Sequence, residues 1–188
     1  MLDKKDFENI RKELVSFEAK RENVIQSSRL IIKISKQIIY SLHRDDISSA
    51  TKFVNDIKKE IKSLDKNKNY DTGISSVAFQ EFVEALIFYE IVKNSKFPTR
   101  KQLDVDVESY LSGIADLTGE LVRKAVHDSI NNNFESVIKI KELVEHIYGE
   151  FLKFDLRNGE LRKKSDSIRW NLNKLEDMAF NISVGSKL

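Results

Sequence analysis

The sequence contains no cysteine, only one proline and only six glycines in 188 residues. The absence of cysteine excludes disulfide bonds and thiolate-bound metals, and it fits a reducing, cytoplasmic setting. Proline and glycine interrupt helices, so their scarcity favours an all-α fold. No apolar run reaches the roughly 18 residues of a membrane span. The first residues, MLDKKDFENIRKEL, do not resemble a signal peptide.

Charged residues make up 33% of the chain and apolar residues 40%, a balance typical of a soluble globular protein. The length corresponds to one ordinary domain, which we place over residues 1–188. The formal net charge is only +2. Any attraction to nucleic acid must therefore come from the arrangement of the basic residues and not from their total.

Apolar residues recur at helical spacing through most of the chain, and no segment keeps the alternation of a strand. The pattern predicts helices over residues 3–42, 46–64, 74–94, 105–131 and 134–153, a short turn over 99–103, and a last helix that ends near residue 182. The residue before Pro98 resists helical geometry, which ends the third helix. We therefore expect an all-α bundle of about six to seven helices with no β-sheet.

Two pairs of carboxylates lie on helices that are otherwise mostly apolar. Glu81 and Glu84 are three residues apart in FQEFVEAL (79–86), and Asp116 and Glu120 are four apart in GIADLTGEL (113–121), so each pair shares one helix face. A buried carboxylate must be paired, protonated or bound to a metal, and oxygen-only ligands suit Mg²⁺ or Mn²⁺. Partial exposure, or salt bridges to Arg123 or to lysines, would also explain the pattern, and the pattern alone leaves both interpretations open.

A row of basic residues follows one face of the first helix. On a helical wheel its members lie within a sector of about 90°, while the isoleucines group on the other side, toward the core. Such a row can track a phosphate backbone, and a tyrosine within it can stack on a base; a plain solvated helix face is the alternative. The row consists of Arg29, Lys33, Lys36, Tyr40 and Arg44, and Arg21 and His43 flank it.

The last helix carries a weaker candidate for nucleic-acid binding, the basic group Arg162, Lys163 and Lys164. We expect Trp170 to pack within the bundle or at an interface. His146 is expected to have a structural role.

Four stretches, in the order of the chain, resemble the translin/TRAX family. KRENVIQSSRLIIKISKQIIYSLHR (20–44) is similar to the basic N-terminal helix of the family. FQEFVEA (79–85) resembles the TRAX motif in which a glutamine precedes the first of two glutamates. DVESYLSGIADLTGELVR (106–123) joins a translin-like segment to the DLTGEL segment of TRAX, and RNGELRKKSDSIRWNLNKLEDMAFNIS (157–183) resembles the C-terminal helix of translin.

The resemblance implies a bundle of about seven helices that assembles into a closed hexameric or octameric shell. TRAX subunits are Mg²⁺-dependent endoribonucleases for single-stranded RNA, whereas translin subunits bind RNA and single-stranded DNA and lack these acids. By motif, Glu81, Glu84 and Asp116 match the catalytic acids of TRAX, and Glu120 completes the DLTGEL motif as a fourth metal ligand. The resemblance thus implies that the four acids hold Mg²⁺, or Mn²⁺ in its place.

The chain departs from TRAX at three places. The connection NSKFPTRKQLDVD (94–106) is short where TRAX often carries an insertion, the C-terminal helix is closer to translin, and His127 stands where we expect asparagine. TRAX acids and translin-like segments in one chain indicate a self-sufficient homo-oligomer. We expect a cytoplasmic endoribonuclease that cuts single-stranded RNA, with single-stranded DNA as a second ligand and no membrane partner.

Three other functions compete with this interpretation. A translin-like protein that holds RNA or single-stranded DNA without cutting it is the main alternative, and the retained acids argue against it. An all-α nucleotide pyrophosphatase also uses E-x-x-E, but it typically has a second E-x-x-D where this chain has D-x-x-x-E at 116–120. A ferritin-like di-iron site is excluded, because it needs E-x-x-H in two helices and none of the three histidines follows a glutamate at that spacing.

Overall fold

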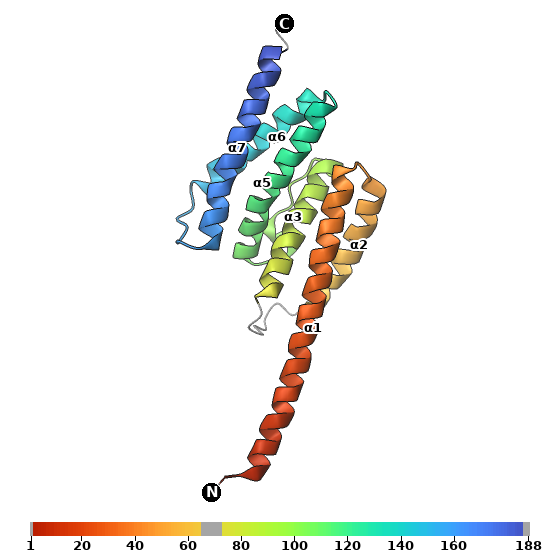
Figure 1. The fold of residues 1–188 in the computed structure, drawn as a ribbon, viewed down its shortest axis with the longest axis vertical. Coiled ribbons are helices and arrows are strands. Elements are labelled where there is room, and N and C mark those ends of the chain that lie inside the picture. Colours follow the sequence, from red (N-terminus) through yellow and green to blue (C-terminus); the bar gives the residue numbers. More distant parts are fainter. Residues whose placement is uncertain (1, 65–72, 186–188) are drawn as a thin grey trace.

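The structure, a computed structural model, describes residues 2–64 and 73–185. Within these residues the chain forms seven helices and no strand, so the expected all-α bundle is confirmed (Figure 1). The helices are α1 (Lys4–His43), α2 (Ile47–Ser63), α3 (Ile74–Asn94), α4 (Arg100–Leu103), α5 (Val107–Ile130), α6 (Phe134–Phe151) and α7 (Glu160–Gly185). Not one of the described helices is both long and apolar enough to cross a membrane.

Most helices begin where the sequence provides a capping side chain. Asp3, Asp46 and Asp106 accept hydrogen bonds from backbone N–H groups in the first turns of α1, α2 and α5, and Asn133 does so for α6. Thr99 starts a capping box at α4. The helix ends expected from the apolar pattern agree with the observed ones to within about three residues.

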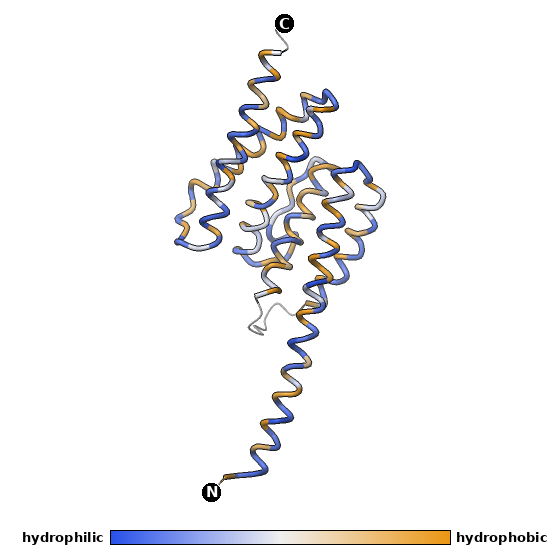
Figure 2. Tube along the Cα trace, viewed as in Figure 1, coloured by the Kyte–Doolittle hydropathy of each residue, from blue (hydrophilic) through white to orange (hydrophobic). Residues whose placement is uncertain are grey.

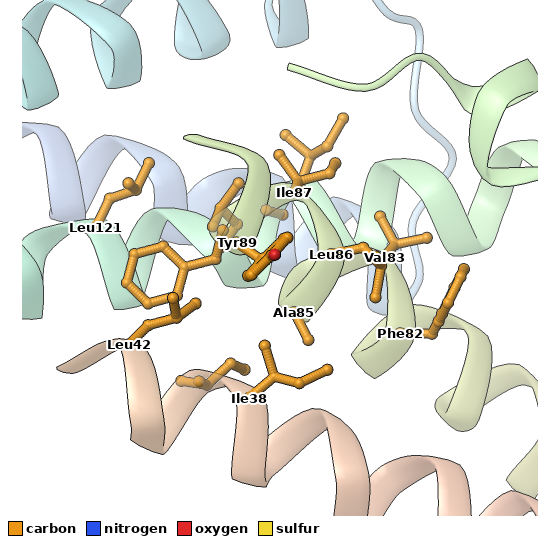
Figure 3. Packing of buried hydrophobic residues seen from close by; sticks show 14 of the residues in the cluster. Ile38, Leu42, Phe82, Val83, Ala85, Leu86, Ile87, Tyr89 and Leu121 are labelled. Atoms are coloured by element: carbon orange, nitrogen blue, oxygen red, sulfur yellow. The ribbon is translucent and has the colours of Figure 1, made fainter. Parts of the chain in front are cut away.

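The long helices form two adjoining groups. Helices α1, α2 and α3 pack together on one side, α5, α6 and α7 on the other, and α3 packs along α5 where the groups meet (Figure 1). Every residue from Phe82 to Tyr89 of α3 is buried, which makes α3 the central helix. Figure 3 shows Ile38 and Leu42 of α1 and Leu121 of α5 packed around it.

Helix α1 changes its surroundings along its length. From Val24 onward its core-facing residues are buried, and Ile31, Ile38 and Leu42 are fully so. Its first half projects beyond the bundle, away from the end that carries the C-terminus (Figure 1). Apolar residues continue along this projecting half (Figure 2). Those at helical spacing on one face, all partly exposed, are Phe7, Ile10, Leu14 and Phe17.

Helix α7 uses a different face from the one that Trp170 occupies. Its buried residues are Ile168, Leu172 and Leu175, whereas Trp170 is 68% exposed. Of the two places expected for Trp170, within the bundle or at an interface, the structure does not support the first, because the helix docks through the 168–172–175 face. An interface with another molecule stays a prediction for this residue.

Candidate functional site

Helices α3 and α5 cross at short distance beside Gly113. A Cβ atom at Gly113 would lie 2.7 Å from the carbonyl oxygen of Gln80 and 2.7 Å from Cβ of Val83, so only glycine leaves room for this approach. Glu81 and Glu84 directly follow the two contacted residues of α3. Asp116 lies one turn after Gly113 on α5, and the crossing therefore brings the two acidic faces together.

Glu84 is the most deeply buried of the four acids, with 9% of its surface exposed. Burial, followed by the negative charges of Asp116, Glu81 and Glu120, raises the pKa of Glu84 from 4.5 to about 8. The positive charge of Lys164 acts in the opposite direction and lowers the pKa of Glu84. Glu84 is thus mostly protonated near neutral pH, and an added cation would favour its ionised form.

Glu81 is partly buried and faces the same cluster. Burial raises its pKa, Lys36 of α1 acts in the opposite direction, and Asp116 adds to the rise. The influence of Lys36 means that the basic row on α1 comes within electrostatic reach of the acids. The spacing of residues along one helix predicts only which of its side chains share a face. That Lys36 of α1 lies near Glu81 of α3 follows from how the two helices pack.

Asp116 is bonded to a lysine from α7. Lys164 Nζ lies 2.5 Å from Asp116 Oδ2 and 2.9 Å from Gln80 Oε1 on α3. Asn171 fixes α7 against α5 nearby, because its side-chain amide donates a hydrogen bond of 2.9 Å to Thr118 Oγ1. Three helices therefore meet at the Asp116 carboxylate.

Glu120 has a different partner, at the end of α1. His43 Nε2 lies 2.5 Å from Glu120 Oε2, and Arg123 Nη1 lies 3.7 Å from the same oxygen. The hydrogen bond with His43 lowers the pKa of Glu120, against the opposing effect of burial. His43 is itself buried, with its ring centroid 5.1 Å from that of Phe88. Glu120 thus acts on Glu84 through its charge while it is bonded to His43.

The four acids lie near one another, but their side chains are not positioned as a set of metal ligands. In residues 2–64 and 73–185, no three Asp, Glu, His or Cys side chains are grouped so that they could hold a metal ion. Asp116 is bonded to Lys164, and Glu120 to His43. Cation binding at these acids therefore requires some side chains to move.

A groove of about 750 Å³ lies between α1 and α2, beside the basic row. Tyr40 is 58% exposed there, and the Arg44 guanidinium lies over its ring, 5.5 Å from the centroid. Arg21 does not line the groove and pairs with Glu18 at 3.7 Å. The groove is lined by Arg29, Lys33, Lys36 and Tyr40 from α1 and by Ser49 and Phe53 from α2, among others.

The sequence contains few signals for the residues that position the four acids or pair with them. Gly113 is one glycine inside a helix, and only its conflict with helix propensity marks it as a packing position. Lys164 is one of three consecutive basic residues, and nothing local distinguishes it from its neighbours. His43 looks like a flank of the basic row, yet its ring is buried and reaches Glu120.

Comparison of the structure with known proteins gives close matches over the whole fold. The structure called apo-NeC3PO matches with a TM-score of 0.87 and 33% identity, over 96% of this chain and 97% of that chain. The complex of AfC3PO with duplex RNA matches with a TM-score of 0.83 and 27% identity, over 96% of this chain and 97% of that chain.

Sequence comparisons lead to the same family. An uncharacterized protein of Methanocaldococcus jannaschii is 32% identical over 167 residues, which cover 86% of this chain and 75% of its own length. Translin-associated protein X of Rattus norvegicus is 24% identical over 232 residues, which cover 97% of this chain and 79% of its own length. The Translin family model matches residues 19–186. The chain therefore belongs to the Translin family.

Proposed function

We propose that this protein binds RNA along α1 and cleaves its phosphodiester backbone at the acids of α3 and α5, as a Mg²⁺-dependent endoribonuclease. The observation that carries the proposal is the meeting of the two surfaces: Lys36 belongs to the basic groove and also acts electrostatically on Glu81. A phosphate backbone held in the groove would pass close to the carboxylates. The resemblance of FQEFVEA (79–85) and DLTGEL (116–121) to TRAX motifs supports a catalytic role for these acids.

The four acids offer the oxygen ligands that Mg²⁺ prefers. All four side chains offer carboxylate oxygens, and Glu84 is buried among three other acids that raise its pKa. A divalent cation would relieve this repulsion. Glu81, Glu84 and Asp116 are the proposed ligands, with Glu120 as the fourth, and Mn²⁺ is expected to substitute for Mg²⁺.

The residues of the chain have separate tasks in the proposed reaction. Lys33 and Lys36 hold the phosphate backbone, and Tyr40 stacks on an unpaired base. When bound, Mg²⁺ supplies an activated water and stabilises the charge that develops on the leaving oxygen. A glutamate of the cluster accepts the proton from the attacking water.

We propose single-stranded RNA as the substrate, because an exposed Tyr40 beside a basic groove suits unstacked bases. The related AfC3PO structure contains duplex RNA, so duplex RNA is the natural comparison in any assay. Single-stranded DNA is expected to bind the same groove, because the contacts proposed for Lys33, Lys36 and Tyr40 do not involve the 2′-hydroxyl.

Self-association into a hexamer or octamer is part of the proposal. The projecting half of α1 supports it, because Phe7, Ile10 and Leu14 form an apolar stripe that is only partly covered within the described chain. A helix of this length without tertiary contacts is only marginally stable in water. Contact with another subunit would bury the stripe.

Cleavage of a labelled single-stranded RNA, with Mg²⁺ or with EDTA, tests the function. The wild type should cut in Mg²⁺ only, and Glu84→Ala should abolish cutting while light scattering shows an unchanged oligomer. Glu90→Ala is the matched control, because Glu90 lies on the same helix but is bonded to Asn94 at its surface. RNA binding without cutting by the wild type would instead assign the chain to the non-catalytic, translin-like alternative.

A further inference from the structure

We propose that Lys164 is a built-in counterion of the acidic site, which competes with the divalent cation for Asp116. The inference rests on the proposed metal site and adds a control element to it. A metal ion that takes Asp116 Oδ2 must displace the ammonium group from that oxygen, so the Lys164–Asp116 pair opens when a cation binds there. Breaking this ion pair would make the free energy of cation binding less favourable than it would be at the same four carboxylates without Lys164.

The position of Lys164 is set by three helices. Its Nζ donates to Asp116 Oδ2 of α5 at 2.5 Å and to Gln80 Oε1 of α3 at 2.9 Å. The side chain is 27% exposed, so the ammonium is drawn partly out of water toward the two oxygens. Gln80 directly precedes Glu81, and Lys164 therefore spans both acidic helices.

Helix α7 holds this lysine in a defined register. Ile168, one turn after Lys164, is fully buried, and Asn171 donates to Thr118 Oγ1 of α5 at 2.9 Å. The backbone of Lys164 is thus fixed against α5, while four side-chain bonds remain rotatable. The ammonium can leave Asp116 without any movement of α7.

The two preceding basic residues have other partners, which makes the arrangement specific to Lys164. Lys163 Nζ pairs with Glu160 at 2.6 Å on an exposed surface, and its side chain is 74% exposed. Arg162 pairs with Asp166 at 3.3 Å. Only the third basic residue of the run reaches the acids, where its charge also acts on Glu81 and Glu84.

Electrostatics explains why the pair would regulate cation binding. The positive charge of Lys164 offsets part of the mutual repulsion among the carboxylates, and it stabilises the fold when no metal is present. A divalent cation placed at the same carboxylates would meet repulsion from the ammonium at short range. Removal of the ammonium should therefore strengthen cation binding and weaken the metal-free fold.

The test compares Lys164→Met with Lys163→Met, its exposed neighbour, and with Lys164→Arg, which keeps the charge and can pair with Asp116. Mn²⁺ is the probe, measured by calorimetric titration and by the rise in melting temperature over an EDTA reference, without RNA. We expect Lys164→Met to melt at a lower temperature in EDTA and to bind Mn²⁺ about tenfold more tightly. Lys163→Met and Lys164→Arg should stay close to the wild type.

Asp116→Asn separates the two hypotheses. If it removes Mn²⁺ binding from both the wild type and Lys164→Met, the metal is held where we propose. Unchanged or weaker Mn²⁺ affinity in Lys164→Met, with a wild type that does bind Mn²⁺ through Asp116, would overturn the competition and leave Lys164 as a structural contact. Absence of Mn²⁺ binding in all variants would overturn the metal site as well.

Discussion

His43 Nε2 of α1 lies 2.5 Å from Glu120 Oε2 of α5, although 77 residues separate them in the sequence. The contact joins the first group of helices to the second. The ring of His43 also lies against Phe88 of α3, so the pair sits on the core. It keeps Glu120 ionised by lowering its pKa.

Replacement of His43 by leucine should destabilise the fold by about 1–3 kcal/mol, because it leaves a partly buried carboxylate without its hydrogen-bond donor. The hydrogen bond lowers the folded pKa of Glu120, so its contribution is present above pH 4.5 and is lost as the pH falls further. Urea unfolding at pH 7 and pH 4 measures both effects. His146→Leu, at an exposed histidine, is the control, and an equal loss at that site would contradict the assignment.

Glu84→Gln should stabilise the protein increasingly as the pH rises from 5 to 8. The folded pKa of about 8 lies above the unfolded value of 4.5, so the folded wild type holds its proton more tightly, and its stability falls across this window. Glutamine carries no proton to lose. The difference between variant and wild type should grow with pH, with a slope of up to roughly 1.4 kcal/mol per pH unit.

Urea unfolding in EDTA at pH 5, 6.5 and 8, at one fixed protein concentration, measures this difference. Glu90→Gln on the same helix should show no such trend. If the difference between Glu84→Gln and the wild type stays constant with pH, Glu84 is ionised throughout this range. Its pKa would then not be raised, and the argument that a cation would relieve repulsion at Glu84 would fail.

Gly113→Ala should cost about 1–3 kcal/mol, because the new methyl group would lie 2.7 Å from the Gln80 carbonyl oxygen and from Val83. The helices would have to separate where the acidic faces meet, so RNA cleavage should fall as well. Gly119→Ala on the same helix is the control, since among the described residues its Cβ would meet only Asn171 Nδ2, at 3.8 Å. Alanine favours a helix over glycine by up to about 1 kcal/mol, so Gly119→Ala should be neutral or stabilising.

Much of the fold is encoded locally, and this part could be predicted. The caps Asp46, Asp106 and Asn133 mark helix starts, and the 3.6-residue period places Ile31 and Ile38 in the core. The same period correctly places Glu81 and Glu84 on one face, because a spacing of three residues fixes their relative direction.

The partners of the acids could not be predicted in this way. Lys164 reaches Asp116 across 48 residues of sequence, and His43 reaches Glu120 across 77. Such contacts depend on how α7 and α1 dock against α5, which no spacing within a single helix specifies. The exposure of Trp170 has the same origin, since residue type alone favours burial and the docking face decides otherwise.

Lys33→Ala combined with Lys36→Ala should weaken RNA binding and its dependence on salt. Each lost phosphate contact lowers the slope of log K against log salt by about 0.7 for a single strand, so the double variant should lose about 1.4. Fluorescence anisotropy across a salt series measures the slope. Lys58→Ala with Lys59→Ala, at two exposed lysines of α2, should leave the slope unchanged. An equal loss in this control would mean that RNA is attracted by the total positive charge and not by the groove.

The projecting half of α1 gives the prediction that tests assembly. Ile10→Asp with Leu14→Asp should reduce the subunit number seen by size exclusion with light scattering, because two charges on the stripe would have to be buried in the subunit contact. Val15→Asp is the matched control: Val15 is 71% exposed, more than either residue, but lies about 120° from the stripe on the helix. All three positions lie outside the bundle, so the fold itself should melt normally. An unchanged subunit number in the double variant would show that the assembly forms without this stripe. The apolar face of the projecting half of α1 would then need a different partner.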